Sequence, residues 1–465
     1  MAKLKPYEKY KETNVNWMGS MPSHWEIRKN SLLFREVTDT NHTDLELLSI
    51  MLDRGIVKQS STGRKKRMSE NNQLYKRICV GDIGYNLMNA FMGSIGASKY
   101  EGIISPAYAV CRPKIKLNPW YYHYLFRTPM YKAEFNKNSY GIMYERNRLY
   151  FDRFKRIFAF VPPVSEQDQI VRYLDYQLTK INKFIKVKRK LISLLKEQKQ
   201  AVVNEAVTKG INRDVKVKQS GIDLLGEIPD CWDVKPLKYY VKSNIETLSE
   251  NFDNENEIRY IDISTVGFGE LKKNPVKYKF SDAPSRARRI INYGDTIIST
   301  VRTYLKSMCF VDNGISDCIV STGFAVLTPN EQVYPKLLNY VLSSNYFVSS
   351  VSKNSIGVSY PAISESKLIS LKIALPKNID EQRELLKYIH ENTQAIDKRL
   401  YVAEKEIELI NEYRIRLISD VVTGKVDVRN IEIHAFQNEE QENIIDEDIL
   451  KLEEVPEGEE YEVKW

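Results

Sequence analysis

Basic, amide and aromatic side chains gather near several predicted turns, and no other group of residues in the sequence has a clearer chemical use. The guanidinium fork of arginine matches O6 and N7 of guanine, whereas lysine meets phosphate as a point charge. Asparagine and tyrosine can add amide and stacking contacts. For each residue alone, a solvated surface charge is the competing interpretation, so the prediction concerns the clusters. They comprise Arg64, Lys65, Lys66, Arg67, Asn89, Arg146, Asn147, Arg148, Arg286, Arg288, Arg289, Arg302, Tyr304 and Lys306, for which we predict DNA contact.

No arrangement of residues in the sequence indicates catalysis. A G-x-x-x-x-G-K-[ST] loop for nucleotide phosphates is missing, because Gly424-Lys425 lacks the upstream glycine and the following Ser or Thr. There is no H-E-x-x-H pair, and neither the five scattered histidines nor the five cysteines have the spacing of a zinc site. The Asn/Asp-Pro-Pro-Tyr/Phe motif of amino-group DNA methyltransferases is also absent. We therefore expect no catalytic residue, no metal and no cofactor on this chain.

Composition and charge favour a folded, basic protein. The chain has 465 residues, of which 42% are hydrophobic, and at roughly 100–200 residues per domain this suggests two or three globular units. No apolar run approaches the roughly 18 residues of a membrane span, and the first residues lack the apolar stretch of a signal peptide, so we expect a cytoplasmic protein. Residues 431–465 hold 13 acidic and 2 basic residues, which leaves +19 on the rest of a chain with a net charge of +8. Such a basic body indicates a polyanionic partner such as nucleic acid.

A tandem duplication is the strongest organising signal in the sequence. The segment Met18–Ile27 returns as Leu225–Val234, with its Gly, Pro and Trp matched at a single offset of 207 residues. Further landmarks return in the same order, with offsets that differ by no more than nine residues: Val80–Ile83 as Tyr293–Thr296, Lys137–Tyr144 as Lys353–Tyr360, Glu166-Gln167 as Glu381-Gln382, and Val207-Thr208 as Val422-Thr423. Chance does not readily produce such an ordered set.

Each copy has two parts of different texture. The first, about residues 1–163 and 213–377, is rich in Tyr, Ile, Val and Phe between Gly, Pro and Asn breaks. Runs such as Thr296–Val301 predict strands, and proline-led segments such as Pro119–Phe126 predict short helices. The predicted fold class is therefore α+β, with a mostly antiparallel sheet and short helices in each copy.

The second part of each copy predicts a long helix, within residues 164–212 and 378–428, with Ser165 as the cap of the first. Apolar residues recur there at alternating steps of three and four, which is typical of a coiled-coil seam. Each helix would have about 40 residues and a length of about 60 Å. Packing of the two stripes on each other is the simplest destination for both, with a membrane surface or a partner helix as the alternative. The seam comprises Ile170, Leu174, Leu178, Ile181, Ile185, Ile192, Leu195, Val202 and Ala206, and then Leu385, Ile389, Thr393, Ile396, Leu400, Ile407, Ile410, Leu417 and Val421.

With these motifs together, the chain resembles the specificity subunit of type I restriction-modification systems over residues 13 to about 428. The features that carry the resemblance are the twice-used Gly-x-[Ile/Met]-Pro-x-x-Trp and Gly-Asp-[Ile/Thr] segments, the strand that ends in Pro before Glu-Gln, and the helix that closes in Val-Thr. Ser105–Tyr108 is also similar to part of a target recognition domain. Each feature alone is weak, but their duplicated order is specific.

The resemblance implies two target recognition domains, at 1–163 and 213–377, that read the two halves of a gapped double-stranded DNA site. It implies spacer helices at 164–212 and 378–428 that form an antiparallel coiled coil, separate the two domains and bind two methyltransferase subunits. Those partners would supply S-adenosylmethionine and adenine methylation, and restriction subunits would supply ATP- and Mg-dependent translocation and cleavage. The chain itself would be non-catalytic. Eight seam residues are then the expected coiled-coil and partner contacts: Ile181, Ile185, Ile192, Leu195, Ile396, Leu400, Ile407 and Ile410.

The resemblance also places the Lys137–Tyr144 and Lys353–Tyr360 loops near DNA, which adds Tyr144 and Tyr360 to the predicted contacts. The acidic segment 429–465 matches no feature of the family and is predicted to be a flexible, solubilising tail, with a DNA-mimicking or partner-binding role as the alternative. Two other interpretations of the whole chain stay open at this point: an autonomous DNA-modifying or DNA-cleaving enzyme with an unrecognised site, and a scaffold built on the helical hairpin.

Overall fold

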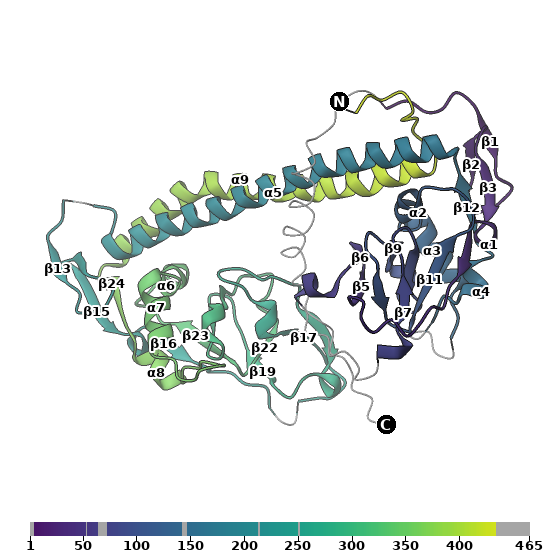
Figure 1. Cartoon of the computed structure of the whole chain (residues 1–465). Coiled ribbons are helices and arrows are strands. Elements are labelled where there is room, and N and C mark those ends of the chain that lie inside the picture. The colour runs from purple at the N-terminus through teal and green to yellow at the C-terminus, as the bar shows by residue number, and fades with distance from the viewer. Residues whose placement is uncertain are drawn as a thin grey trace. The chain divides into compact units, whose positions relative to one another are not determined.

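The computed structural model describes residues 4–52, 54–63, 72–141, 147–212, 214–249 and 252–433 (Figure 1). The chain divides into two compact units, Met1–Arg189 with Glu404–Val455, and Lys190–Ala403 with Pro456–Trp465. Each unit thus combines one globular part with about half of each of two long helices. The boundaries predicted at residues 163, 212, 377 and 428 divide the chain by repeat and helix instead, and they stay a prediction.

Short strands and short helices form the globular part of the first unit. The strands are β1 (Tyr10–Glu12), β2 (Ser20–Pro22), β3 (Glu26–Lys29), β4 (Phe34–Glu36), β5 (Leu48–Met51), β6 (Gly55–Lys58), β7 (Lys76–Ile78), β8 (Ile83–Asn86), β9 (Ile95–Ala97), β10 (Gly102–Ile104), β11 (Tyr108–Pro113) and β12 (Phe158–Val161). The helices are α1 (Asn30–Leu33), α2 (Pro119–Leu125), α3 (Pro129–Asn138) and α4 (Phe151–Phe154). Proline opens α2 as predicted, and the side chain of Asn118 caps it by accepting the Trp120 N–H at 2.9 Å.

The globular part of the second unit has the same kind of elements. Its strands are β13 (Val217–Gln219), β14 (Glu227–Pro229), β15 (Trp232–Pro236), β16 (Val241–Ser243), β17 (Glu257–Ile261), β18 (Val276–Lys279), β19 (Ala287–Ile290), β20 (Thr296–Ser299), β21 (Met308–Phe310), β22 (Ile319–Ser321), β23 (Phe324–Pro329) and β24 (Lys372–Pro376). Its helices are α6 (Pro335–Leu342), α7 (Asn345–Lys353) and α8 (Glu365–Ser370).

The sheets repeat the duplication seen in the sequence. The central sheet has the order β4-β11-β8-β9 in the first unit and β16-β23-β20-β21 in the second, and every neighbouring pair is antiparallel. The pairs β1-β2 and β12-β3 recur as β13-β14 and β24-β15. The copies differ outside this frame, where the second has a sheet β18-β17-β22-β19 with a parallel β17-β22 pair. The predicted α+β class with mostly antiparallel sheets is confirmed.

The two long helices are α5 (Val164–Lys209) and α9 (Ile379–Val422), which lie alongside each other in Figure 1. Within each unit they run antiparallel: Lys188 pairs with Glu406 at 2.6 Å in the first, and Lys199 pairs with Asp397 at 2.6 Å in the second. The predicted cap at Ser165 is wrong, because α5 already begins at Val164, directly after Pro162-Pro163. Among the described residues, no helix has the length and hydropathy to cross a membrane.

Most of the predicted seam is buried where the helices pack on each other and on the globular parts. Val202 is only half-buried, because its neighbour Val203 is the residue that enters the core of the second unit. Leu178, Ile192, Ile407 and Ile410 are half-buried as well. In the first unit, Ile181 and Ile185 are 5% exposed and belong to the same core as Leu417.

The repeated tryptophan of each copy contacts the start of a long helix. Trp25 donates its indole N–H to Glu166 at 3.0 Å, and Trp232 donates in the same way to Glu381 at 2.7 Å. Both indole rings are fully buried. His24 also contacts Glu166, at 2.8 Å, so that the first carboxylate has a further partner. A buried carboxylate needs such partners, since its charge would otherwise be costly to desolvate.

The glutamine next to that carboxylate joins the helix to the short proline-led helix of its own unit. Gln167 accepts the backbone N–H of Asn118 at 2.8 Å, and Gln382 accepts that of Tyr334 at 3.1 Å. Both glutamines are 1% exposed. The Glu-Gln pair that marks the duplication therefore has a structural role in each copy.

We name the site around Trp25 and Glu166 the first corner and the site around Trp232 and Glu381 the second corner. Each corner also needs a glycine at the end of a long helix. Gly424 has φ +76°, and a Cβ on it would lie 2.4 Å from Cδ of Pro22 and 3.0 Å from Cη2 of Trp25. Gly210 has φ +73° and lies beside Pro229 and Trp232, but the closest contact of a Cβ there would be 3.3 Å. The left-handed conformation ends each helix and lets the proline and tryptophan approach its backbone.

Candidate nucleic-acid interface

Several of the predicted contact residues that the structure describes lie at or beside one turn in each unit, which joins the last two strands in the order of each central sheet. In the first unit the chain leaves β8, makes a short 3-10 turn at Ala90–Met92 and enters β9. In the second it leaves β20, makes the same turn at Thr303–Leu305 and enters β21. We name these the first tip (residues 87–94) and the second tip (residues 300–307).

Matching hydrogen bonds show that the two tips are equivalent. Leu149 donates its backbone N–H to Leu87 O at 2.8 Å, and Ile363 donates to Thr300 O at 2.9 Å. In both units a second backbone segment therefore lies beside the tip and is hydrogen-bonded to it. It is itself folded back, through a Tyr140–Arg148 bridge in the first unit and an Ile356–Ala362 bridge in the second.

The second tip brings four of the predicted residues together. Arg302 is exposed and carries its guanidinium 5.0 Å from the centre of the Tyr360 ring. Tyr304 is 55% exposed and Tyr360 65%, and Lys306 at the end of the turn is also exposed. Arg302 and Lys306 both have left-handed backbones, with φ +51° and +52°. Such conformations are strained for residues other than glycine and concentrate at functional sites.

Thr303 holds the second tip onto the unit below. It is 5% exposed, its hydroxyl hydrogen-bonds Ser355 Oγ at 2.8 Å, and its backbone N–H donates to Pro361 O at 3.2 Å. The bridge between Val301 and Ala362 adds a second connection. The tip therefore presents exposed side chains from a backbone that is fixed on both sides.

The first tip presents a different set of side chains from the same backbone arrangement. Asn89 is half-buried, and Met88 and Met92 beside it are 38% and 50% exposed. Gly93 takes the position of Lys306, with φ +110°, and a Cβ there would lie 2.7 Å from Cε of Lys132. The exposed methionines carry no charge or amide that would have marked them in the sequence.

The segment that follows the first tip carries two more predicted contacts. Arg148 is exposed and exchanges backbone hydrogen bonds with Tyr140, and Asn147 precedes it, half-buried. Tyr140, 46% exposed, lies under the guanidinium of Arg153 at 5.2 Å, so an arginine–tyrosine pair occurs here too. Six other predicted contacts lie outside the described residues: Arg64, Lys65, Lys66, Arg67, Tyr144 and Arg146.

The arginines near β19 behave differently from one another. Arg286 is exposed, and its backbone O accepts the N–H of Thr322 at 2.9 Å. Arg288 is half-buried and stacks 4.9 Å from the centre of the Phe280 ring. Arg289 turns inward to Asn244 and the backbone O of Phe324, and burial lowers the pKa of its guanidinium. Nη1 of Arg289 is therefore occupied by acceptors within the unit, which makes this arginine less suited to a DNA contact than an exposed one.

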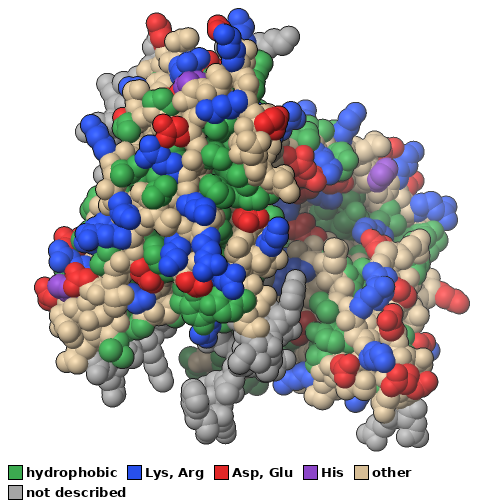
Figure 2. Space-filling view, turned by 90° about the vertical axis from the view of Figure 1, so that its right-hand side faces the viewer, with side chains coloured by type: hydrophobic (Ala, Val, Ile, Leu, Met, Phe, Trp, Pro, Cys, Tyr) green, Lys and Arg blue, Asp and Glu red, His purple; other side chains and the backbone are tan. Residues whose placement is uncertain are grey.

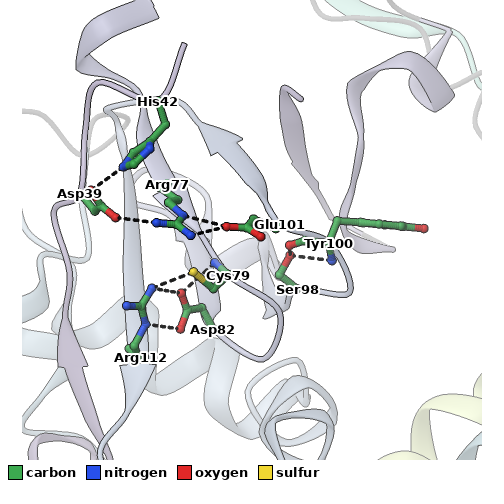
Figure 3. A network of polar contacts seen from close by, with 9 residues as sticks. All are labelled: Asp39, His42, Arg77, Cys79, Asp82, Ser98, Tyr100, Glu101 and Arg112. Atoms are coloured by element: carbon green, nitrogen blue, oxygen red, sulfur yellow. Dashed lines mark hydrogen bonds and ion pairs between the residues drawn. The ribbon is translucent and has the colours of Figure 1, made fainter. Parts of the chain in front are cut away.

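The Gly-Asp turn ahead of each tip fixes the strand that leads to it. Asp82 is almost fully buried and receives two hydrogen bonds from Arg112, at 2.9 and 2.8 Å (Figure 3). It also accepts the Cys79 backbone N–H at 2.9 Å. The equivalent Asp295 accepts the Asn292 N–H at 2.8 Å, but Thr328 stands where the first unit has Arg112. Burial accordingly raises the pKa of Asp295.

Surface charge alone does not single out the tips. Figure 2 shows one face of the molecule, on which Lys and Arg side chains are spread among hydrophobic and acidic ones. No group of three His, Cys, Asp or Glu side chains suited to a metal ion occurs within the described parts of the chain. What distinguishes the tips is their exposed aromatic, apolar and cationic side chains on a fixed backbone.

The eight seam residues expected to be coiled-coil and partner contacts are buried or half-buried by packing in the core clusters that contain α5 and α9. Ile181, Ile185, Leu195, Ile396 and Leu400 are at most 9% exposed. Ile192, Ile407 and Ile410 are half-buried against the same clusters. A partner of the helices would instead meet outward residues that the seam pattern missed, such as Leu409 and Ile415, which are 62% and 55% exposed.

Comparisons with known proteins agree with the resemblance drawn from the sequence. The specificity subunit of the type I restriction enzyme MjaVIII from Methanocaldococcus jannaschii is 27% identical over 285 residues, which are 60% of this chain and 64% of that protein. A second specificity subunit of the same organism, assigned to the type I restriction enzyme MjaX, is 24% identical over 444 residues, 91% of this chain and 97% of that protein. No protein-family model matches the chain.

The fold also has a solved counterpart. A chain from a structural study of complex assembly and conformational transition in the type I R-M system aligns with a TM-score of 0.57 at 15% identity. The alignment covers 86% of this chain and 98% of that one. The curated homologues are thus specificity subunits of type I restriction enzymes, and the resemblance is confirmed.

Proposed function

We propose that this chain is the DNA sequence-specificity subunit of a type I restriction-modification complex and reads the two halves of a gapped, double-stranded target. The observation that carries the proposal is one scaffold used twice with different side chains at equivalent exposed tips. Asn89 and Met92 occupy the first tip where Arg302 and Leu305 occupy the second. Two copies of a fold on one chain suit the recognition of two separated half-sites. Similarity to specificity subunits along nearly the whole chain supports the same role.

The chemistry of such a complex would reside on other subunits. We propose two methyltransferase subunits, which use S-adenosylmethionine to methylate adenine, and restriction subunits, which use ATP and Mg²⁺ to translocate and cleave DNA. The present chain would be non-catalytic and would act in the cytoplasm. The paired helices α5 and α9, within the proposed segments 164–212 and 378–428, would set the gap between half-sites and offer outward residues to the methyltransferase subunits.

Mapping adenine methylation at base resolution tests this function. The gene is expressed with its methyltransferase partner in a host that lacks other adenine methylation, and the partner alone serves as the control. The proposal expects one gapped, two-part motif to be methylated only when both are present. Methylation by the partner alone, or by this chain alone, would contradict a non-catalytic specificity role.

A further inference from the structure

Among the described residues, no hydrogen-bond acceptor occupies the guanidinium of Arg302, so its hydrogen-bonding edge is free. Its guanidinium contacts Tyr360 through the face of the ring, at 5.0 Å, and no described carboxylate forms an ion pair with it. The donors of Arg289 and Arg259, by contrast, are occupied by Asn244 and Asp317. Stacking uses the face of a guanidinium and leaves its in-plane N–H donors available.

The position of Tyr360 is determined by the backbone around it. The bridge between Ile356 and Ala362 closes a narrow loop, and Gly357 within it has φ +118°. A Cβ on Gly357 would lie 3.0 Å from Tyr360 O, so the loop can close in this way only around glycine. The Val301–Ala362 bridge then ties the loop to the residue preceding Arg302. Arg302 and Tyr360 are thus brought together by backbone contacts as well as by their own stacking.

We propose that Arg302 determines specificity in the second half-site by donating to O6 and N7 of one guanine, and that Tyr360 is a positioning residue which holds the guanidinium for that contact. The inference rests on the proposed function. A phosphate contact needs only a flexible positive charge, and Lys306 at the same tip supplies one. A stacked guanidinium has already lost much of its rotamer freedom, so less entropy is lost on forming a bidentate contact. Guanine is the base whose two major-groove acceptors match this fork.

A protein–DNA double-mutant cycle tests the inference with the assembled complex and its methylation-defined target. Each guanine of the second half-site is replaced in turn by 7-deazaguanine, which lacks the N7 acceptor, and affinities are measured at one salt concentration. The wild-type complex should lose about 10-fold in affinity at a single guanine. Arg302→Ala should bind the natural target about 10-fold more weakly and lose nothing further at that guanine. Arg286→Ala, an exposed arginine of the same unit, is the matched control and should keep the full 10-fold effect.

Variants of Tyr360 separate positioning from folding. Tyr360→Phe keeps the ring and should retain the coupling between Arg302 and the guanine, whereas Tyr360→Ala should lose most of it with unchanged affinity for unrelated DNA. Coupling that is absent at every guanine, or an Arg302→Ala variant that weakens specific and unrelated DNA equally, would overturn the inference while leaving the proposed function intact. If the wild-type complex showed no sequence-specific binding at all, the proposed function would fail and this inference with it.

Discussion

Replacing Arg112 by threonine would give the first unit the residue that the second unit has at the equivalent position. Asp82, whose side chain is 2% exposed, would lose both hydrogen bonds from Arg112, whose side chain is 30% exposed. Breaking a fully buried ion pair costs about 3–5 kcal/mol. Water screens the partly exposed Arg112, and the Cys79 N–H remains, so we expect a loss of about 2–3 kcal/mol at pH 7.

Amide hydrogen exchange resolved along the chain is the suitable assay, since two units need not unfold together. The expected loss corresponds to exchange about 30- to 150-fold faster in peptides that span residues 79–98, where β8, the first tip and β9 lie. Arg77→Thr is the matched control, because Arg77 pairs with the exposed Glu101 and Asp39. Such surface pairs contribute about 1 kcal/mol or less. Equal acceleration in the two variants, or none in Arg112→Thr, would refute the assignment of Asp82–Arg112 as the pair that fixes the tip.

The reverse substitution, Thr328→Arg, tests the same reasoning through pH. Burial raises the pKa of Asp295, so the folded state holds its proton more tightly than the unfolded state. Its contribution to stability is therefore greatest below the unfolded pKa of about 3.9 and is lost as the pH rises through the folded pKa. A guanidinium beside Asp295 should stabilise the second unit at pH 7 and have little effect near pH 3. A stabilisation that was equal at both pH values would show that the new arginine acts by some contact other than this carboxylate.

Three further predictions concern the corners and the helices. Trp232→Phe should lower the unfolding temperature more than Trp25→Phe does. Glu166 keeps Tyr7 and His24 as partners, whereas Glu381 keeps, among the described residues, only the distant Cys231 thiol. Calorimetry of both variants measures the difference, and equal shifts would contradict the argument. Gly424→Ala should lower the urea midpoint more than Gly210→Ala does. The Cβ at position 424 would lie 2.4 Å from Pro22, whereas the Cβ at position 210 would lie 3.3 Å from Pro229. A reversed order would show that the two corners relax differently from their static geometry. Leu409→Asp should leave stability unchanged and reduce co-purification with the methyltransferase subunit, because Leu409 is exposed. Ile410→Asp should instead destabilise the helix pair, because Ile410 is half-buried within it. Retained co-purification of the Leu409→Asp variant would exclude this part of α9 as the contact.

The sequence predicted the scaffold well because periodicity and duplication report on packing. Helical spacing identified Ile181 and Leu195 as seam residues, and the error at Val202 is a single position on a helix where two adjacent valines compete for the core. The roles of Glu166 and Gln167 could not be derived in this way, because Trp25 and Asn118, which they bind, lie more than 45 residues away in the chain. The duplication marked both as important without saying to what they bind.

The tips show the opposite limit of sequence-based prediction. Arginine is equally suited to a surface contact and to an inward hydrogen bond, and nothing in the sequence separates Arg289 from Arg302. The structure separates them by what surrounds each guanidinium: buried oxygens in one case, and the face of an exposed tyrosine in the other. Met88 and Met92 were missed for a different reason, since an exposed methionine has no pattern that distinguishes it from a buried one.

The corners and the tips place different demands on the same duplicated fold. At the corners, Trp25 and Trp232 are fully buried and bind a carboxylate, so a change there must be met by changes in several neighbours at once. At the tips, the backbone is held by main-chain bonds such as Leu149 N to Leu87 O, which do not depend on the identity of the side chains. Side chains there can therefore change without altering the path of the chain, apart from positions such as Gly93, whose φ of +110° is strained for a residue with a Cβ. A protein that must recognise different DNA sequences with one fold needs this division, and it explains why the residues that reveal the duplication are not those that we expect to contact bases.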